Sequence, residues 1–111
     1  MAIDNANVID VISTDEIQNE IVLTIADHLD WELKMKHLLK LQTKINTYLS
    51  YIENGEIYEK YTIPPDKKIV IFVAGKYDLP NDKDVQDFYS RAGEVVKQLS
   101  VTLRFEKILT P

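Results

Sequence analysis

Two short runs of mainly β-branched, apolar residues constrain the fold of this chain more than any other feature. They occupy residues 21–26 and 69–74. The second run is apolar at every position, which is expected of a strand in the interior of a sheet rather than at its edge. We therefore place residues 69–74 at the centre of a β-sheet.

A long amphipathic helix is predicted between these two strands. It begins at Trp31, with Asp30 as its N-cap, and it stops at Asn54-Gly55. Residues 56–61 add a short helical turn before two consecutive prolines, which cannot continue a helix. The apolar stripe of this helix consists of Trp31, Leu38, Leu41, Ile45, Tyr48 and Ile52.

A second helix and two further strands complete the predicted elements. The helix opens at residues 80–82. Residues 8–12 form a hairpin with residues 21–26 across the polar segment 13–19, and residues 101–105 alternate as in a strand near a sheet edge. The apolar stripe of the second helix consists of Val85, Phe88, Ala92, Val95 or Val96, and Leu99.

The predicted order is therefore ββαβαβ, which indicates an α+β (α/β-like) fold. Crossovers through a single helix make the strands that they join parallel and right-handed, so the four-stranded sheet is mixed and carries two amphipathic helices. The chain has 111 residues and no interdomain linker, so we expect residues 1–111 to form a single domain.

The second face of this sheet is a predicted interaction surface. If the other alternating residues point at the helices, this face carries Val22, Thr24, Val70 and Phe72. Such a surface is too apolar to be left in water. Either the helices lie on opposite faces of the sheet, or this face joins a homodimer or binds another partner.

The composition predicts a cytoplasmic protein. The chain lacks cysteine, which excludes disulfides and thiolate metal sites. It shows no export signal and no apolar run as long as a membrane span. Its net charge of -5 disfavours nucleic acid, whose phosphates it would repel, and suits a basic protein partner.

Known catalytic signatures are missing from the sequence. The three glycines form no phosphate-binding loop, and there is no nucleophile elbow and no helical histidine pair for zinc. We expect no cofactor and no bound metal. Lys36, Lys40 and Lys44 share one helical face, which we interpret as a solvated face rather than an RNA site.

The best candidate site lies where residues 21–26 give way to the first helix. It contains Asp27, His28 and Asp30, and an imidazole beside two carboxylates can bind a metal or transfer protons. Trp31 is placed to stack on a ligand. The alternative is structural: Asp27 and Asp30 favour the helix start, His28 is a loop residue, and Trp31 packs against the end of the sheet.

Tyrosines indicate a second candidate surface. Tyr51, Tyr58 and Tyr61 gather with Tyr48 around the end of the first helix and its extension. Tyrosine supplies a large contact area with little conformational entropy to lose, although the same residues can form a satellite core. The acidic residues that would attract a basic partner are Asp15, Glu16, Asp82, Asp84 and Asp87.

Four stretches of the chain carry a resemblance to a known family. They are residues 22–31 (VLTIADHLDW), 37–46 (HLLKLQTKIN), 52–58 (IENGEIY) and 73–77 (VAGKY). Across nearly its whole length the chain resembles an uncharacterised family of small bacterial domains of unknown function. The resemblance implies a free-standing bacterial protein, and it carries over no catalytic or binding residue.

From the sequence we expect a non-enzymatic protein-interaction module. An immunity or antitoxin-like inhibitor that binds a basic partner fits the small size, the acidity and the aromatic contact area. The alternative is an enzyme that binds a small molecule or a metal at Asp27, His28 and Asp30. A homodimer through the second sheet face is a third hypothesis.

Overall fold

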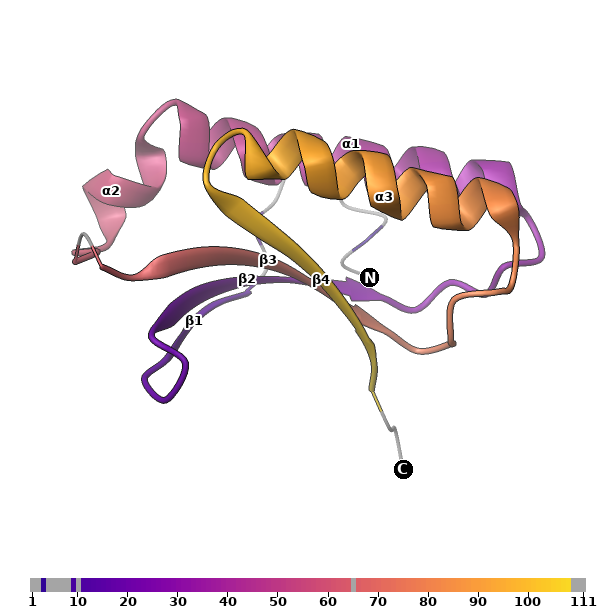
Figure 1. The fold of residues 1–111 in the computed structure, drawn as a ribbon, viewed down its shortest axis with the longest axis horizontal. Helices are drawn as coiled ribbons and strands as arrows, with labels where there is room; N and C mark the ends of the chain where they lie inside the picture. The colour runs from indigo at the N-terminus through magenta and orange to yellow at the C-terminus, as the bar shows by residue number, and fades with distance from the viewer. Residues whose placement is uncertain (1–2, 4–8, 10, 65, 109–111) are drawn as a thin grey trace.

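The computed structural model describes residues 3, 9, 11–64 and 66–108 (Figure 1). The elements follow the order β-β-α-α-β-α-β, which confirms the predicted α+β class, and the short helix α2 lies in the predicted helical turn. The elements are β1 (Val11–Asp15), β2 (Glu20–Asp27), α1 (Lys34–Glu53), α2 (Glu56–Lys60), β3 (Lys68–Gly75), α3 (Lys83–Lys97) and β4 (Val101–Lys107).

The four strands form one mixed sheet in the order β1-β2-β3-β4. β1 is antiparallel to β2, whereas β2, β3 and β4 are parallel to one another. β3 lies between β2 and β4, and its Ile69, Val70, Ile71 and Val73 are all buried. The prediction that residues 69–74 form an interior strand is therefore confirmed.

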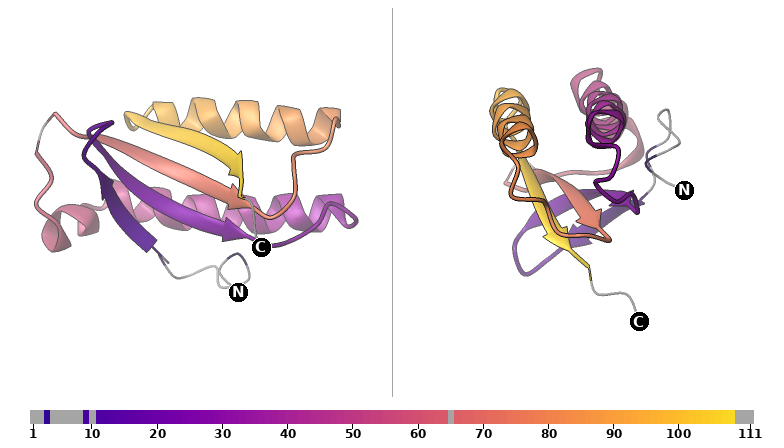
Figure 2. Two further views of the ribbon diagram at one scale, coloured as in Figure 1. Left: turned by 90° about the horizontal axis from the view of Figure 1, so that it is seen from below. Right: turned by 90° about the vertical axis from the view of Figure 1, so that its right-hand side faces the viewer.

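Both long helices cover the same face of the sheet, as Figure 2 shows. The chain moves one strand along the sheet in each crossover, first from β2 to β3 and then from β3 to β4. Two right-handed crossovers that advance in the same direction place their helices on the same side. The hypothesis that the helices lie on opposite faces is therefore wrong.

The main core fills the space between the sheet and the two helices. Leu23, Ile25, Ile71 and Val73 point from the strands toward α1, where Leu41 has no exposed surface. α1 is also held by the hydroxyl of Tyr48, which is fully buried and donates a hydrogen bond of 2.7 Å to the backbone oxygen of Thr24. This bond fixes the helix against β2.

The opposite face of the sheet has no helix over it, but an ion pair crosses part of this face. The Arg104 guanidinium donates two hydrogen bonds, of 3.1 and 3.0 Å, to the two carboxylate oxygens of Glu20. Arg104 lies on β4 and Glu20 on β2, so in the observed register the pair passes over Val70 on the intervening strand. Val70 is fully buried as a result, while Val22 and Phe72 stay half-buried.

The first strand lies nearer to the hairpin turn than the sequence predicts. Residues 11–12 of the predicted strand are in β1, Ile9 is not, and residues 8 and 10 are outside the described part of the chain. β1 instead continues to Asp15, whose carboxylate accepts hydrogen bonds from the backbone amides of Ile17 and Gln18. This side chain closes a tight turn, so most of the predicted loop is not needed.

The first helix begins later than predicted. α1 starts at Lys34 after Leu33, and no side chain caps it, so the assignment of Asp30 as the N-cap is wrong. The Asp30 carboxylate instead accepts a hydrogen bond from the amide of Glu32 within a turn. The helix stop at Asn54-Gly55 is confirmed, and Gly55 has a φ of 85°, which glycine adopts without strain.

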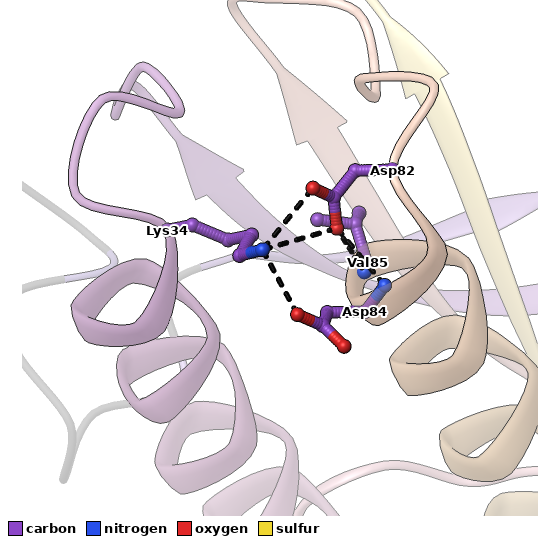
Figure 3. Close-up of polar contacts among 4 residues, drawn as sticks. All are labelled: Lys34, Asp82, Asp84 and Val85. Carbon is purple, nitrogen blue, oxygen red and sulfur yellow. Dashed lines mark hydrogen bonds and ion pairs between the residues drawn. The ribbon is translucent and has the colours of Figure 1, made fainter.

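A cluster of charged residues joins the starts of the two long helices (Figure 3). The Lys34 ammonium group lies 2.9 Å from Asp84 and 3.1 Å from Asp82. Asp82 is the N-cap of α3, and its carboxylate accepts hydrogen bonds from the amides of Asp84 and Val85. The Lys34 hydrogen bond lowers the pKa of the Asp82 carboxyl below its ordinary value of 3.8.

Two glycines provide a matched pair of substitutions. A Cβ on Gly75 would lie 2.6 Å from the Phe105 ring, whereas a Cβ on Gly93 in α3 would meet nothing within 4 Å. We expect Gly75→Ala to lower the free energy of unfolding by about 1–3 kcal/mol through overpacking. Gly93→Ala should raise it by about 0.5–1 kcal/mol through helix propensity. Urea denaturation measures both, and equal effects would contradict the described packing.

Substitutions of Asp82 should show a distinct dependence on pH. Because folding lowers its pKa, ionised Asp82 stabilises the protein above pH 3.8, and this contribution is lost as the pH falls through the lower folded-state value. Asp82→Asn keeps a capping oxygen, so its stability deficit should shrink in acid. Asp82→Ala also loses the cap, so its deficit should persist. Thermal unfolding at several pH values between neutral and acid measures both deficits. If the stability deficits of the two variants change in parallel with pH, the ion pair contributes nothing to stability.

Candidate functional site

A buried carboxylate–imidazole pair occupies the carboxyl end of β2. Asp27 is the last residue of the strand, and His37 lies in the first turns of α1. Asp27 Oδ2 and His37 Nε2 are 2.6 Å apart, and the two residues are only 4% and 2% exposed. The other Asp27 oxygen accepts a hydrogen bond from the amide of Leu29. The pair therefore joins strand, turn and helix.

The hydrogen-bond partners of His37 determine how many protons the pair holds. Nδ1 lies 2.9 Å from the backbone oxygen of Asp30, which can only accept, so Nδ1 carries a proton. A second proton must lie between Nε2 and the Asp27 carboxyl. The pair is then either an imidazolium and a carboxylate or a neutral ring and a carboxylic acid. In both forms its net charge is zero, which reduces the cost of burying it.

Trp31 and Asp30 hold the imidazole from the turn before α1. The Trp31 indole stacks on the His37 ring with a centroid distance of 3.7 Å and an interplanar angle of 21°. Asp30 contributes its backbone oxygen to His37 while its own carboxylate remains in the exposed turn. Both residues therefore support His37. The Asp30 carbonyl is bonded to the His37 side chain rather than to a backbone amide of α1, so the helix starts later than predicted.

Tyr89 of α3 approaches the same end of the sheet. Its hydroxyl oxygen is buried and has no hydrogen-bond partner among the residues that the structure describes. Burial raises the pKa of Tyr89 well above its ordinary value, and the negative charge of Asp27 raises it further. The phenol ring packs edge-on against Phe105. Tyr89 is therefore a protonated, structural neighbour of the pair.

An open groove of about 540 Å³ lies beside the pair. His28 and the almost fully buried His37 are among its lining residues. The remaining lining residues are Leu29, Asp30, Glu32, Leu33, Lys36, Lys40 and Tyr77. The structure thus brings together Asp27, Asp30 and Trp31 around His37, and it places His28 at the adjacent groove.

The geometry of this site favours a structural role for the pair. Both ring nitrogens of His37 are bonded to protein groups, so neither one is available to accept a proton from a ligand in the groove. In the described part of the chain, no three or more His, Asp or Glu side chains gather closely enough to hold a metal ion. The groove can bind a ligand by contact, but its chemistry is limited to exposed polar side chains.

The predicted tyrosine cluster divides into two parts. Tyr48 and Tyr51 lie on α1 and are buried in the main core of the protein, not in a separate satellite core. Tyr58 and Tyr61 are 55% and 41% exposed. Within this cluster, Tyr58 and Tyr61 are the residues that present a large aromatic surface to solvent.

The predicted basic and acidic surfaces are also rearranged by the fold. Lys44 is fully buried, so the interpretation of Lys36, Lys40 and Lys44 as one solvated face is wrong. The acidic residues do not share a surface either: Asp15 and Glu16 lie at the β1–β2 turn, at the opposite end of the sheet from the start of α3 (Figure 1). The acidic residues at the α3 start are Asp82, Asp84 and Asp87.

His37 is the residue of this site that the sequence analysis missed. Its own position carried a signal, because it precedes Leu41 by four residues and so lies on the buried stripe of α1. A histidine on such a stripe needs partners for both nitrogens. Tyr89 gave a weaker signal, since it neighbours the predicted stripe residue Phe88.

The fold and the site define a small two-layer α+β protein with an almost fully buried histidine–carboxylate pair. The chain belongs to the family of unknown function DUF6572, which matches residues 1–108. None of the curated proteins and none of the solved structures compared with the chain is similar to it. Among the described helices, none is long and apolar enough to cross a membrane.

Removing one member of the buried pair should destabilise the protein strongly. Asp27→Ala leaves the His37 Nε2 without its partner, so we expect the free energy of unfolding to fall by about 3–5 kcal/mol. Asp30→Ala is the matched control, because it keeps the backbone oxygen that His37 needs and should change stability by only about 0.5 kcal/mol. Urea unfolding followed by Trp31 fluorescence measures both. Equal losses of unfolding free energy in the two variants would show that the Asp27–His37 pair does not stabilise the protein.

Proposed function

We propose that this protein is a non-enzymatic interaction module that binds a basic protein partner in the bacterial cytoplasm, in the manner of an immunity protein or antitoxin. The observation that carries this proposal is the exposure of Tyr58 and Tyr61 together, on and directly after α2. Tyrosine is enriched in the binding sites of protein interfaces because it combines a large apolar area with a polar tip.

Three glutamates lie near the two exposed tyrosines in the sequence, and Lys60 lies between the tyrosines. Glu53, Glu56 and Glu59 are all exposed near them, at the end of α1 and on α2. Exposed carboxylates steer a basic partner toward the surface and raise its association rate. We call Tyr58, Tyr61 and these three glutamates the tyrosine surface.

A groove beside the tyrosine surface adds shape to it. The groove has a volume of about 510 Å³, and its lining includes Tyr61, Tyr51 and Glu56. Burial raises the pKa of the Tyr51 phenol, with further contributions from Tyr61 and Glu56. Tyr51 therefore keeps its proton at neutral pH. A groove with two phenol groups on its wall suits a partner side chain that offers both apolar contact and hydrogen bonds.

The alternative function, an enzyme at Asp27, His28 and Asp30, has less support. The carboxylate of Asp27 is bonded to His37 and to an amide, and the carboxylate of Asp30 is bonded to an amide of its own turn. A homodimer through the open sheet face is supported by the placement of both helices on the other side. The Arg104–Glu20 pair nevertheless already covers Val70 there.

The proposal predicts a specific loss of partner binding. Tagged protein is used to capture partners from a lysate of its own host, comparing the native chain with Tyr58→Ala/Tyr61→Ala and with Tyr77→Ala. Tyr77 is the matched control, because it is 42% exposed but lies beyond β3, at the other end of the sheet. The double variant should bind the partner at least about 30-fold more weakly, as for hot-spot residues.

The identity of the captured protein completes this test. A stoichiometric basic protein that is released by salt, retained by Tyr77→Ala and lost from the double variant supports the proposal. Capture by the native chain and the double variant to the same extent would exclude the tyrosine surface as the binding site. Recovery of the native chain alone, with candidate partners expressed, would count against the interaction module itself.

A further inference from the structure

The outer surface between α1 and α3 contains a third groove, which is separate from the tyrosine surface. Its volume is about 450 Å³. The floor is apolar and consists of Leu38, Ile45, Leu49, Phe88 and Ala92, with Met35 and Val95 at its margins. Met35 and Val95 are 66% and 51% exposed, so the groove leaves large apolar side chains in water. We call this feature the interhelix groove.

The two helices run side by side along the groove, as the end-on view of Figure 2 shows. Lys34 joins them at their amino-terminal ends through Asp82 and Asp84 (Figure 3). The lining positions on α1 extend from Met35 to Leu49, which corresponds to about 21 Å of helix at 1.5 Å per residue. This length matches about four turns of another helix.

The charged residues on the α3 wall indicate which kind of helix fits. Asp84 is already paired with Lys34. The Asp87 side chain is half-buried, and its carboxylate forms no hydrogen bond or ion pair with any residue that the structure describes. Arg91 lies one turn further along the wall but is exposed and does not pair with Asp87. An apolar occupant would strip water from Asp87, and this costs free energy unless the occupant brings a cation.

We infer that the interhelix groove binds an amphipathic helix of a partner protein, with apolar residues on the floor and a lysine or arginine paired with Asp87. This is the helix-in-groove mode, in which residues spaced three and four apart anchor one face of the bound helix. The acidic net charge of the chain, -5, attracts such a helix at long range. The two amides on the α1 wall, Gln42 and Asn46, can donate to and accept from its polar side.

The test uses two synthetic peptides and a pair of charge-matched variants. Each peptide has about fourteen residues, which span about 21 Å as a helix, with leucines on one face. One carries lysines beside the leucines and the other carries glutamates. Asp87→Lys reverses the charge in the groove. Glu94→Lys makes the same charge change at an exposed α3 residue outside the groove lining, and it is the control.

Fluorescence anisotropy should show preferential binding of the lysine peptide to the native chain. Asp87→Lys should weaken this binding about tenfold or more and should strengthen binding of the glutamate peptide, while Glu94→Lys should change both less than about threefold. Val95→Lys, which places a charge on the apolar margin, should weaken both peptides. Circular dichroism checks that each variant retains its helices.

Several results would overturn the inference. Equal binding of the two peptides, or equal losses in Asp87→Lys and Glu94→Lys, would show only general charge attraction. Self-association of the native chain that Val95→Lys abolishes, seen by sedimentation, would make a second copy the occupant. The substitutions Tyr58→Ala and Tyr61→Ala lie outside this groove. Their effects therefore separate a failure of the tyrosine surface from a failure of the interhelix groove.

Discussion

The direction of the two crossovers determines most of this structure. Because each crossover is right-handed and moves one strand the same way along the sheet, α1 and α3 must lie on one face. That placement creates the interhelix groove on one side and an uncovered sheet face on the other. It also brings the ends of β2 and β3 to the edge where the helices start. The interhelix groove and the uncovered sheet face therefore both follow from strand order.

The buried pair of Asp27 and His37 solves a packing problem at that edge. The chain must turn from a buried strand into a helix over the sheet, and the polar groups of the turn would otherwise lose water without new partners. The imidazole bonds the strand end through Asp27 and the turn through the backbone oxygen of Asp30. Trp31 covers its ring. Because both ring nitrogens of His37 are bonded to protein groups, this geometry suits stabilisation of the turn better than catalysis.

Charged side chains that pair with one another cover parts of the protein surface, whereas the unpaired ones lie on surfaces that a partner can reach. Arg104 and Glu20 pair over the exposed sheet face, and Lys34 joins the two helix starts. By contrast, Asp87 is left without a described partner inside an apolar groove, and the glutamates of the tyrosine surface are exposed. A basic partner would meet negative charge at both places. This common chemistry links the proposed function with the inferred helix site.

The α+β class, the interior position of residues 69–74 and the stop of α1 could all be predicted from the sequence, because apolar periodicity and a glycine with positive φ act locally. The sequence also placed a polar cluster at the end of β2. The contact of His37 with that cluster and the burial of Lys44 became evident from the packed fold. Strand order, and with it the face that the helices cover, depends on contacts between residues far apart in the chain. Such contacts leave no periodic pattern in the sequence, so packing alone selects them.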